Sequence, residues 1–108
     1  MELQESKVGS FSVVNLEGRL DTSNFGELEK LLIGLIDRGE KEIVVNCAGL
    51  IYVSSSGLRV LLMVLKKITA AGGKFHLCSL QDNICEIFEI SGFTSIFKIF
   101  KNLEEAVG

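Results

Sequence analysis

Apolar residues follow two spacings along the chain, one typical of strands and the other typical of helices. Two short β-rich runs cover residues 3–8 and 11–16, and the glycine-containing turn between them predicts a hairpin. Later apolar runs at residues 42–46 and 74–80 have the composition of buried strands. The pattern of residues 96–100 predicts one more strand at the outer edge of the sheet.

A helical spacing of apolar residues follows the hairpin and predicts the first helix. Asn24 and Glu27 stand at capping-box spacing, so we expect Asn24 to cap the start of this helix. Gly39 follows Arg38 as the expected C-cap. The apolar positions that recur at helical spacing are Phe25, Leu28, Leu32, Leu35 and Ile36.

The second expected helix starts at the serine run 54–56 and ends at the glycine pair Gly72-Gly73. Two shorter helices are expected at residues 82–90 and 102–107. The inner face of the second helix is expected to contain Leu58, Leu61, Leu62, Leu65 and Ile68, widened by Val64 and Thr69.

Strands and helices interleave from residue 42 onward, which indicates crossover connections and parallel strands. The initial hairpin adds an antiparallel pair, so the sheet is expected to be mixed. We therefore predict an α/β fold, with a mostly parallel central sheet of about five strands packed by about four helices. Residues 1–108 are expected to form one domain, since domains cluster around ~100–150 residues.

The charge balance and apolar runs exclude several classes of protein. A net charge of −3 with pI near 5.1 provides no basic surface for direct nucleic-acid binding. The longest apolar runs, such as residues 60–65, are far shorter than the ~20 residues that span a bilayer. The first ten residues carry Glu2 and Glu5 and lack the apolar core of a signal peptide. We expect a soluble cytoplasmic protein without membrane insertion.

The sequence contains few features that are typical of enzymes or metal sites. Cys47, Cys78 and Cys85 are odd in number and have no C-x-x-C spacing, so we interpret them as small, mostly buried thiols in a reducing compartment. The only histidine, His76, lies in an expected strand, where packing is a better interpretation than catalysis. No phosphate-binding glycine loop or nucleophile elbow is present. We expect no cofactor, no metal and no enzymatic activity.

The serine run at the start of the second helix is the strongest candidate for a functional site in this sequence. One serine is enough to cap a helix, because its oxygen accepts hydrogen bonds from first-turn amides. Three in a row, Ser54, Ser55 and Ser56, leave at least one hydroxyl unused where the helix dipole favours an anion. A phosphate added there is tolerated without unfolding the helix.

Several segments, in order along nearly the whole chain, resemble the STAS domain family of stand-alone anti-sigma factor antagonists. The first is Gly18-Arg19-Leu20-Asp21, before the first helix. The second is the stretch 51–58, which contains the serine run followed by Gly57-Leu58. The glycine pair at 72–73 and the segment 90–93 with the strand after it complete the match.

This resemblance implies a binding module controlled by phosphorylation. In such proteins the unmodified form binds an anti-sigma factor that is also a serine kinase, and the sigma factor is released. Phosphorylation of a loop serine weakens the complex, and a phosphatase of the PP2C type resets it. Carried onto this chain, the acceptor is Ser55, with Ser56 as the second choice, and Ser54 replaces the aspartate common in the family. Asp21 matches the acidic loop residue beside this surface.

Helix geometry adds a hypothesis about the partner surface. At 100° per residue, Ser55, Arg59, Met63 and Lys66 share one flank of the second helix. We expect this flank and the Asp21 loop to form the partner-binding surface. Its expected residues are Asp21, Ser54, Ser55, Ser56, Gly57, Arg59 and Met63. Arg59 lies one turn from Ser55 and is a candidate partner for a phosphate, or an ordinary solvated arginine. Val60 and Met63 are candidates for an exposed apolar patch, or for exposed helix filler.

Two other classes of function stay open at this point. One is a STAS scaffold that binds a different partner or a small ligand without phosphorylation, within a signalling or transport assembly. The absence of the aspartate at Ser54 keeps this alternative open. The other is an enzyme, for which the residues supply no pairing of a nucleophile with a base.

Overall fold

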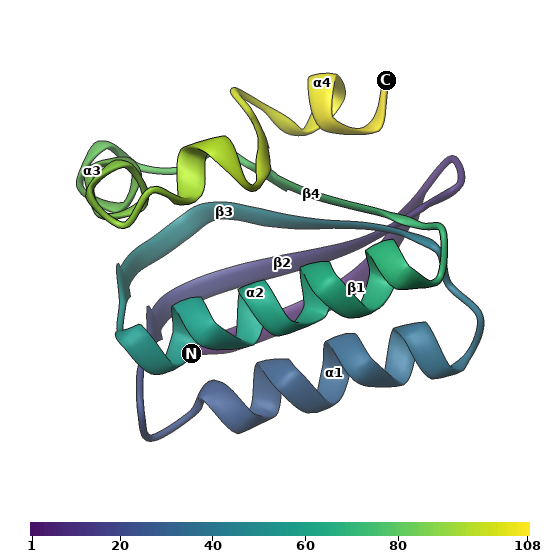
Figure 1. The fold of residues 1–108 in the computed structure, drawn as a ribbon, viewed down its shortest axis with the longest axis horizontal. Helices are drawn as coiled ribbons and strands as arrows, with labels where there is room; N and C mark the ends of the chain where they lie inside the picture. The colour runs from purple at the N-terminus through teal and green to yellow at the C-terminus, as the bar shows by residue number, and fades with distance from the viewer.

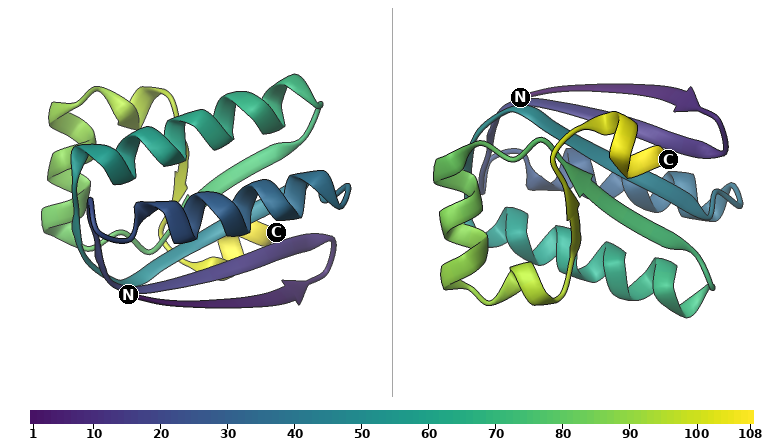
Figure 2. Two further views of the ribbon diagram at one scale, coloured as in Figure 1. Left: turned by 90° about the horizontal axis from the view of Figure 1, so that it is seen from below. Right: turned by 90° about the horizontal axis from the view of Figure 1, so that it is seen from above.

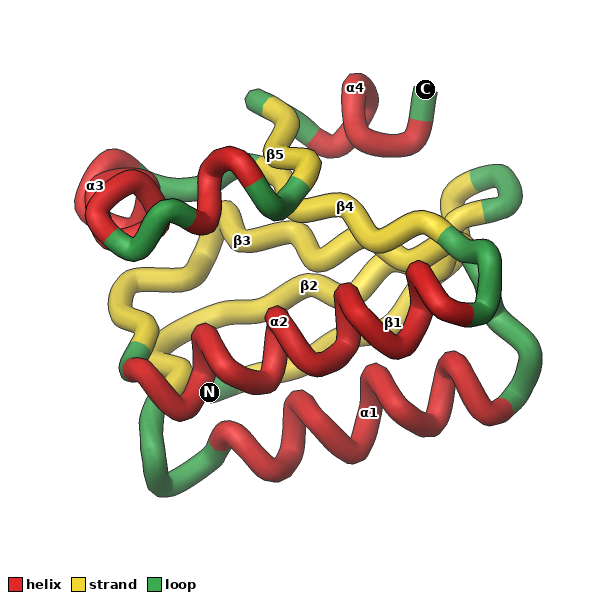
Figure 3. The backbone as a smooth tube through the Cα atoms, in the orientation of Figure 1, coloured by secondary structure: helices red, strands yellow, loops and turns green.

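The computed structural model describes residues 1–108, the whole chain, and it contains one five-stranded sheet (Figures 1 and 3). The strands are β1 (Glu2–Val8), β2 (Phe11–Leu20), β3 (Glu42–Val53), β4 (Lys74–Cys78) and β5 (Lys98–Phe100), adjacent in that order. β1 pairs antiparallel with β2, and the other three pairs are parallel. The predicted mixed, mostly parallel sheet is confirmed.

Helices cover both faces of this sheet (Figures 1 and 2). α1 (Phe25–Asp37) and α2 (Ser55–Ala70) lie side by side on one face, and the short α4 (Leu103–Val107) lies on the other. α3 (Asp82–Ile90) and the 3-10 helix η1 (Phe93–Ser95) stand at one end of the sheet. The four predicted helices are all present. None of them combines the length and apolar character needed to cross a membrane.

The main core lies between the sheet and α1 and α2, and it contains 20 buried residues. A smaller cluster of five lies under α4 on the opposite face. His76 belongs to this second region: its ring centroid is 5.3 Å from that of Phe11 and 4.8 Å from that of Phe100. Its Nδ1 lies 2.8 Å from the carbonyl oxygen of Ala106 in α4. The interpretation of His76 as a packed strand residue is confirmed.

The strand boundaries differ from the sequence prediction at several places. β2 extends to Leu20, beyond the expected end at residue 16, and Gly18, with a φ of +96°, accommodates a register shift within it. Register shifts in the β2–β3 pair interrupt the simple alternation there, which hides the strand from pattern analysis. The predicted strand 96–100 contains only Lys98–Phe100, because Phe97 turns into the main core beside the rings of Phe75, Phe88 and Phe93.

The buried face of α2 is rotated from the one that the sequence predicts. Its fully buried residues are Gly57, Val60, Leu61, Val64 and Ile68. Val60 is 3% exposed, so the interpretation of Val60 as part of an exposed patch is wrong. Thr69 is exposed, and the remaining predicted leucines are only half-buried. The reason is that α2 packs against α1 as well as the sheet, which shifts its buried stripe.

Candidate functional site

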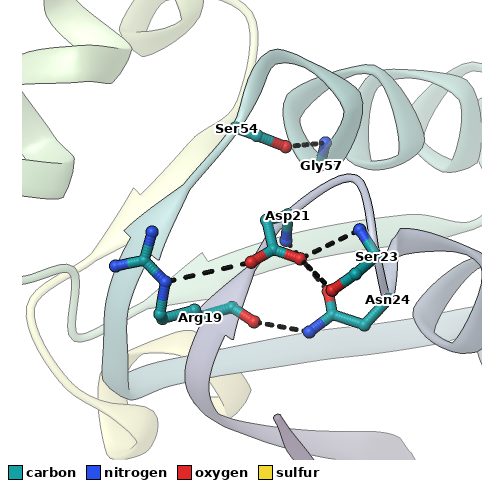
Figure 4. A network of polar contacts seen from close by, with 6 residues as sticks. All are labelled: Arg19, Asp21, Ser23, Asn24, Ser54 and Gly57. Carbon is teal, nitrogen blue, oxygen red and sulfur yellow. Dashed lines mark hydrogen bonds and ion pairs between the residues drawn. The ribbon is translucent and has the colours of Figure 1, made fainter.

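Two loops meet at the carboxyl ends of β2 and β3 (Figure 4). Leu20 and Val53, the last residues of the two strands, are register partners. Beyond them, the backbone N–H of Ser54 donates to the carbonyl oxygen of Leu20 at 2.9 Å. Because neighbouring parallel strands end at the same edge of a sheet, the loop of residues 21–24 lies beside the serine loop. The two motif segments, far apart in sequence, therefore form one surface.

Gly57 allows the start of α2 to approach this edge closely. A Cβ on Gly57 would lie 2.7 Å from Leu20 Cγ and 3.0 Å from Val53 Cγ2. Both of those side chains are buried and have little room to move. A glycine here lets the first turn of α2 rest directly on the strand ends, which brings the serines close to the Asp21 loop.

The three serines have different surroundings. Ser54 is the N-cap of α2, and its Oγ accepts a hydrogen bond of 3.3 Å from the N–H of Gly57. Its carbonyl oxygen accepts from the N–H of Leu58 at 3.0 Å. Ser55 is exposed and Ser56 is half-buried, both in the first turn of the helix. Since Ser54 is used by the cap, the hydroxyl most accessible to an enzyme is that of Ser55.

Asp21 is the centre of a hydrogen-bonded network in the neighbouring loop (Figure 4). One of its carboxylate oxygens, Oδ1, accepts from the backbone N–H of Ser23 at 3.0 Å and from its hydroxyl at 2.6 Å. The other oxygen, Oδ2, lies 3.8 Å from Nε of Arg19. The two Ser23 hydrogen bonds, followed by the charge of Arg19, hold the pKa of Asp21 below its usual value. A carboxylate is therefore kept charged beside the serine loop.

Asn24 ties this loop to β2 and does not cap α1. Its Oδ1 accepts from the N–H of Asp21 at 2.9 Å, and its Nδ2 donates to the carbonyl oxygen of Arg19 at 2.8 Å. Asn24 occupies the N-cap position without a side-chain capping bond, so the predicted capping box with Glu27 is wrong. The physical reason is competition, because the same amide closes the loop onto β2 and has no group left for the helix.

Three of the four residues predicted to share one flank of α2 lie around a common hollow, and Ser55 is not among them. Arg59, Met63 and Lys66 line a shallow hollow of about 240 Å³, together with Leu62, which the sequence pattern assigned to the inner face. Arg59 and Lys66 are exposed, while Leu62 and Met63 are half-buried. The flank therefore combines positive charge with apolar side chains, but Val60 contributes nothing to it.

Sequence analysis missed one element of this region, the pairing of Arg19 with Tyr52. The Arg19 Cζ lies 4.1 Å from the centre of the Tyr52 ring, in a cation–π arrangement. The two residues are register partners across the β2–β3 pair. The signal that would have revealed them is the alignment of the two strands, which depends on the register shifts and is not readable from either segment alone.

The match to a family agrees with this geometry. The sequence model of the STAS domain family matches residues 3–106 of this chain. This chain belongs to the STAS domain family. A curated relative from Bordetella bronchiseptica, assigned as anti-sigma factor antagonist BtrV, is 38% identical over 98% of this chain and 91% of its own length. The anti-sigma-B factor antagonist of Staphylococcus aureus is 25% identical, with 96% of each chain covered.

Solved structures support the same STAS fold. A Thermotoga maritima protein assigned as an anti-sigma factor antagonist superposes with a TM-score of 0.93 at 21% identity, covering 97% of this chain and 91% of the other. The Bacillus cell-fate determinant SpoIIAA, solved in its phosphorylated form, superposes with a TM-score of 0.78 at 23% identity, covering 98% and 96%. At these identities the likeness concerns the fold.

The STAS motifs coincide with the two adjoining loops. The segment 18–21 contains Asp21, and the segment 51–58 contains the cap and the accessible serine. No three histidine, cysteine or acidic side chains gather in a metal-binding arrangement. Cys47 and Cys78 are buried, and burial raises the pKa of both thiols. Cys85 is only half-buried. What the site offers is an accessible hydroxyl at a helix start, beside a fixed carboxylate and a positively charged flank.

Proposed function

We propose that this protein is an anti-sigma factor antagonist switched by phosphorylation. Its unmodified form binds an anti-sigma factor that is also a serine kinase, and a sigma factor is thereby released. The kinase phosphorylates Ser55, the complex weakens, and a PP2C-type phosphatase restores the unmodified form. The protein acts in the cytoplasm as one domain, by binding and not by catalysis. The curated relatives named as antagonists support this proposal.

The observation that carries the proposal is that Ser54 caps the helix while Ser55 is exposed. Ser54 supplies the helix cap, so Ser55 can be modified without loss of a structural hydrogen bond. Ser55 is also exposed at the positive end of the α2 dipole, where a phosphate is tolerated. Ser56 is the second candidate acceptor, and its partial burial makes it less accessible.

The partner surface in this proposal consists of the serine loop, Asp21, and the flank of α2 with Arg59 and Met63. A phosphate dianion within that surface must be desolvated on binding, which costs free energy that the unmodified hydroxyl does not. A loss of roughly 2–5 kcal/mol is expected, which corresponds to a drop in affinity of about thirtyfold or more. Such a switch works through electrostatic and steric exclusion and needs no refolding.

The test is intact-mass analysis after incubation with ATP and serine kinases of the histidine-kinase-like type from the same cell. We expect the gain of one phosphate in the wild type and in Ser56→Ala, and none in Ser55→Ala. Calorimetric titration should then show weaker binding of the phosphorylated form. If the phosphorylated and unmodified forms bind the kinase equally tightly, the switch is wrong.

Ser54 favours a second candidate function. The family's aspartate is absent here, which removes one negative charge from the loop. A STAS scaffold that binds a partner or a small ligand within a signalling or transport assembly needs no phosphorylation. Absence of modification by every such kinase, together with stable capture of a non-kinase partner, would support this alternative.

A further inference from the structure

The guanidinium of Arg19 lies beside Asp21 and has unused hydrogen-bond donors (Figure 4). A guanidinium has five N–H donors. The nearest carboxylate oxygen, Oδ2 of Asp21, is 3.8 Å from Nε, which is beyond hydrogen-bond length. The Arg19 side chain is 58% exposed, so solvent can reach it.

The side chain and the backbone of this arginine are nevertheless each restrained by a neighbouring residue. Its Cζ is 4.1 Å from the centre of the Tyr52 ring, and Tyr52 is its register partner on β3. Its backbone carbonyl accepts the hydrogen bond from Asn24 Nδ2 at 2.8 Å (Figure 4). A long side chain that is already positioned loses less conformational entropy when a partner binds it. Arg19 is therefore preorganised in the free protein.

The surroundings of Arg19 have the composition of an interface anchor. Tyr52 is 37% exposed, and the neighbouring Ile51 is 52% exposed. Arginine and tyrosine are enriched among the residues that dominate binding energy at protein interfaces. An isolated phosphate on Ser55 would leave the exposed apolar surface of Ile51 and Tyr52 in water, whereas a protein partner would bury it. The combination of open donors with exposed apolar surface therefore points to a protein ligand.

We propose that Arg19, held by Tyr52, is an anchor that binds a carboxylate side chain of the kinase partner. The guanidinium and a carboxylate make paired, charge-assisted hydrogen bonds, while apolar atoms of the partner pack on Tyr52 and Ile51. The anchor extends the partner surface from the serine loop onto the ends of two strands, to Arg19 on β2 and Tyr52 on β3. This inference rests on the proposed function, because it assigns a contact within the same complex.

The test compares Arg19→Gln with a matched control, Arg38→Gln. Arg38 is 59% exposed and pairs with Glu5 at 2.9 Å, at the far end of α1 from the serine loop. Calorimetric titration of the kinase that modifies Ser55 should show affinity at least about tenfold weaker for Arg19→Gln. Binding should also become less sensitive to salt, because one charge pair is lost. Arg38→Gln should bind within twofold of the wild type.

Two further variants separate anchoring from folding. Arg19→Lys should restore only part of the affinity, because lysine lacks the planar fork that pairs with a carboxylate. Tyr52→Leu keeps apolar volume but removes the ring face, so it should weaken binding while Arg19 is still present. The free energy of unfolding should stay close to the wild-type value in Arg19→Gln, since an exposed pair contributes little to stability.

The outcomes distinguish this anchor from the switch itself. Tight wild-type binding that Arg19→Gln leaves unchanged would overturn the anchor alone. The anchor is also wrong if the Arg19→Gln variant binds the kinase with the affinity of the unmodified wild type in both its unmodified and its phosphorylated forms. Arg19 would then act on the phosphate of Ser55 and not on a carboxylate of the kinase. Failure of the wild type to bind any kinase that modifies Ser55 would overturn the proposed function, and the anchor with it.

Discussion

The backbone N–H of Ser54 donates a 2.9 Å hydrogen bond to the carbonyl oxygen of Leu20, which joins the ends of two neighbouring strands. This contact fixes the serine loop against the loop of Asp21. It depends on Gly57, whose missing side chain lets the helix start rest on Leu20. The relative position of the two loops is therefore a property of the core edge, and it can be perturbed from inside.

Gly57→Ala is expected to lower the free energy of unfolding by about 1–3 kcal/mol, through overpacking. The added Cβ would lie 2.7 Å from Leu20 Cγ, and Leu20 is fully buried. The matched control is Gly34→Ala within α1, where a Cβ would meet nothing within 4 Å. This control should gain about 0.5–1 kcal/mol from helix propensity. Urea unfolding measures both, and a stabilised Gly57→Ala protein would contradict the prediction.

Ser54→Ala should destabilise the protein by about 0.5–2 kcal/mol, because the N-cap of α2 is lost. Ser54→Asp should stay within about 0.5 kcal/mol of the wild type, since a carboxylate also caps and interacts well with the helix dipole. Ser55→Ala is the control, and its effect should be within about ±0.5 kcal/mol because Ser55 is exposed. Chemical denaturation checks all three. Equal losses in the two alanine variants would show that Ser54 is not the cap that matters.

Arg59 is expected to pair with a phosphate on Ser55, one helical turn away. Phosphorylation should raise the melting temperature of the wild type more than that of Arg59→Ala. The free energy of stabilisation on phosphorylation is expected to differ by about 0.3–1 kcal/mol between the two proteins, because Arg59 is exposed and the pair is screened. Lys66→Ala, further along the same flank, should respond to phosphorylation like the wild type. An identical response in Arg59→Ala would leave Arg59 as a solvated side chain.

Asp21 should titrate below its usual range in the folded protein, because Ser23 donates two hydrogen bonds to its charged form. A folded pKa below the unfolded one means that the carboxylate stabilises the fold above the unfolded value of about 3.9. That contribution is lost as pH falls through the lower, folded pKa. Ser23→Ala should move the pKa of Asp21 upward, as followed by carboxyl NMR. An unchanged Asp21 pKa in this variant would contradict the assigned cause.

Much of the fold was predictable because periodicity reports burial. The apolar run at residues 42–46 marks the first part of β3, which continues to Val53, and the helical spacing after residue 24 corresponds to α1. Phe97 shows the limit of this approach, because its aromatic contacts come from other elements and take it out of the strand pattern. Val60 shows the same limit, since a second helix, α1, rotates the buried stripe of α2.

The site was predictable in its parts but not in its assembly. The serine run predicted a cap and a spare hydroxyl, and the structure assigns the cap to Ser54. The capping box failed because the sequence does not show that Oδ1 of Asn24 already accepts a hydrogen bond from the N–H of Asp21. The pairing of Arg19 with Tyr52 could not be predicted, since it depends on a strand register altered by two shifts between β2 and β3.

The sequence by itself therefore determined the α/β class, the order of the elements and the family, because these follow from local spacing and from motifs within single segments. The tertiary structure alone decided which residues of the two loops meet, which serine is consumed by the cap, and which arginine is held against a ring. The physical reason is that such contacts are made between segments distant in sequence. Their geometry comes from sheet register and from close packing at Gly57, neither of which has a signal in a single run of residues.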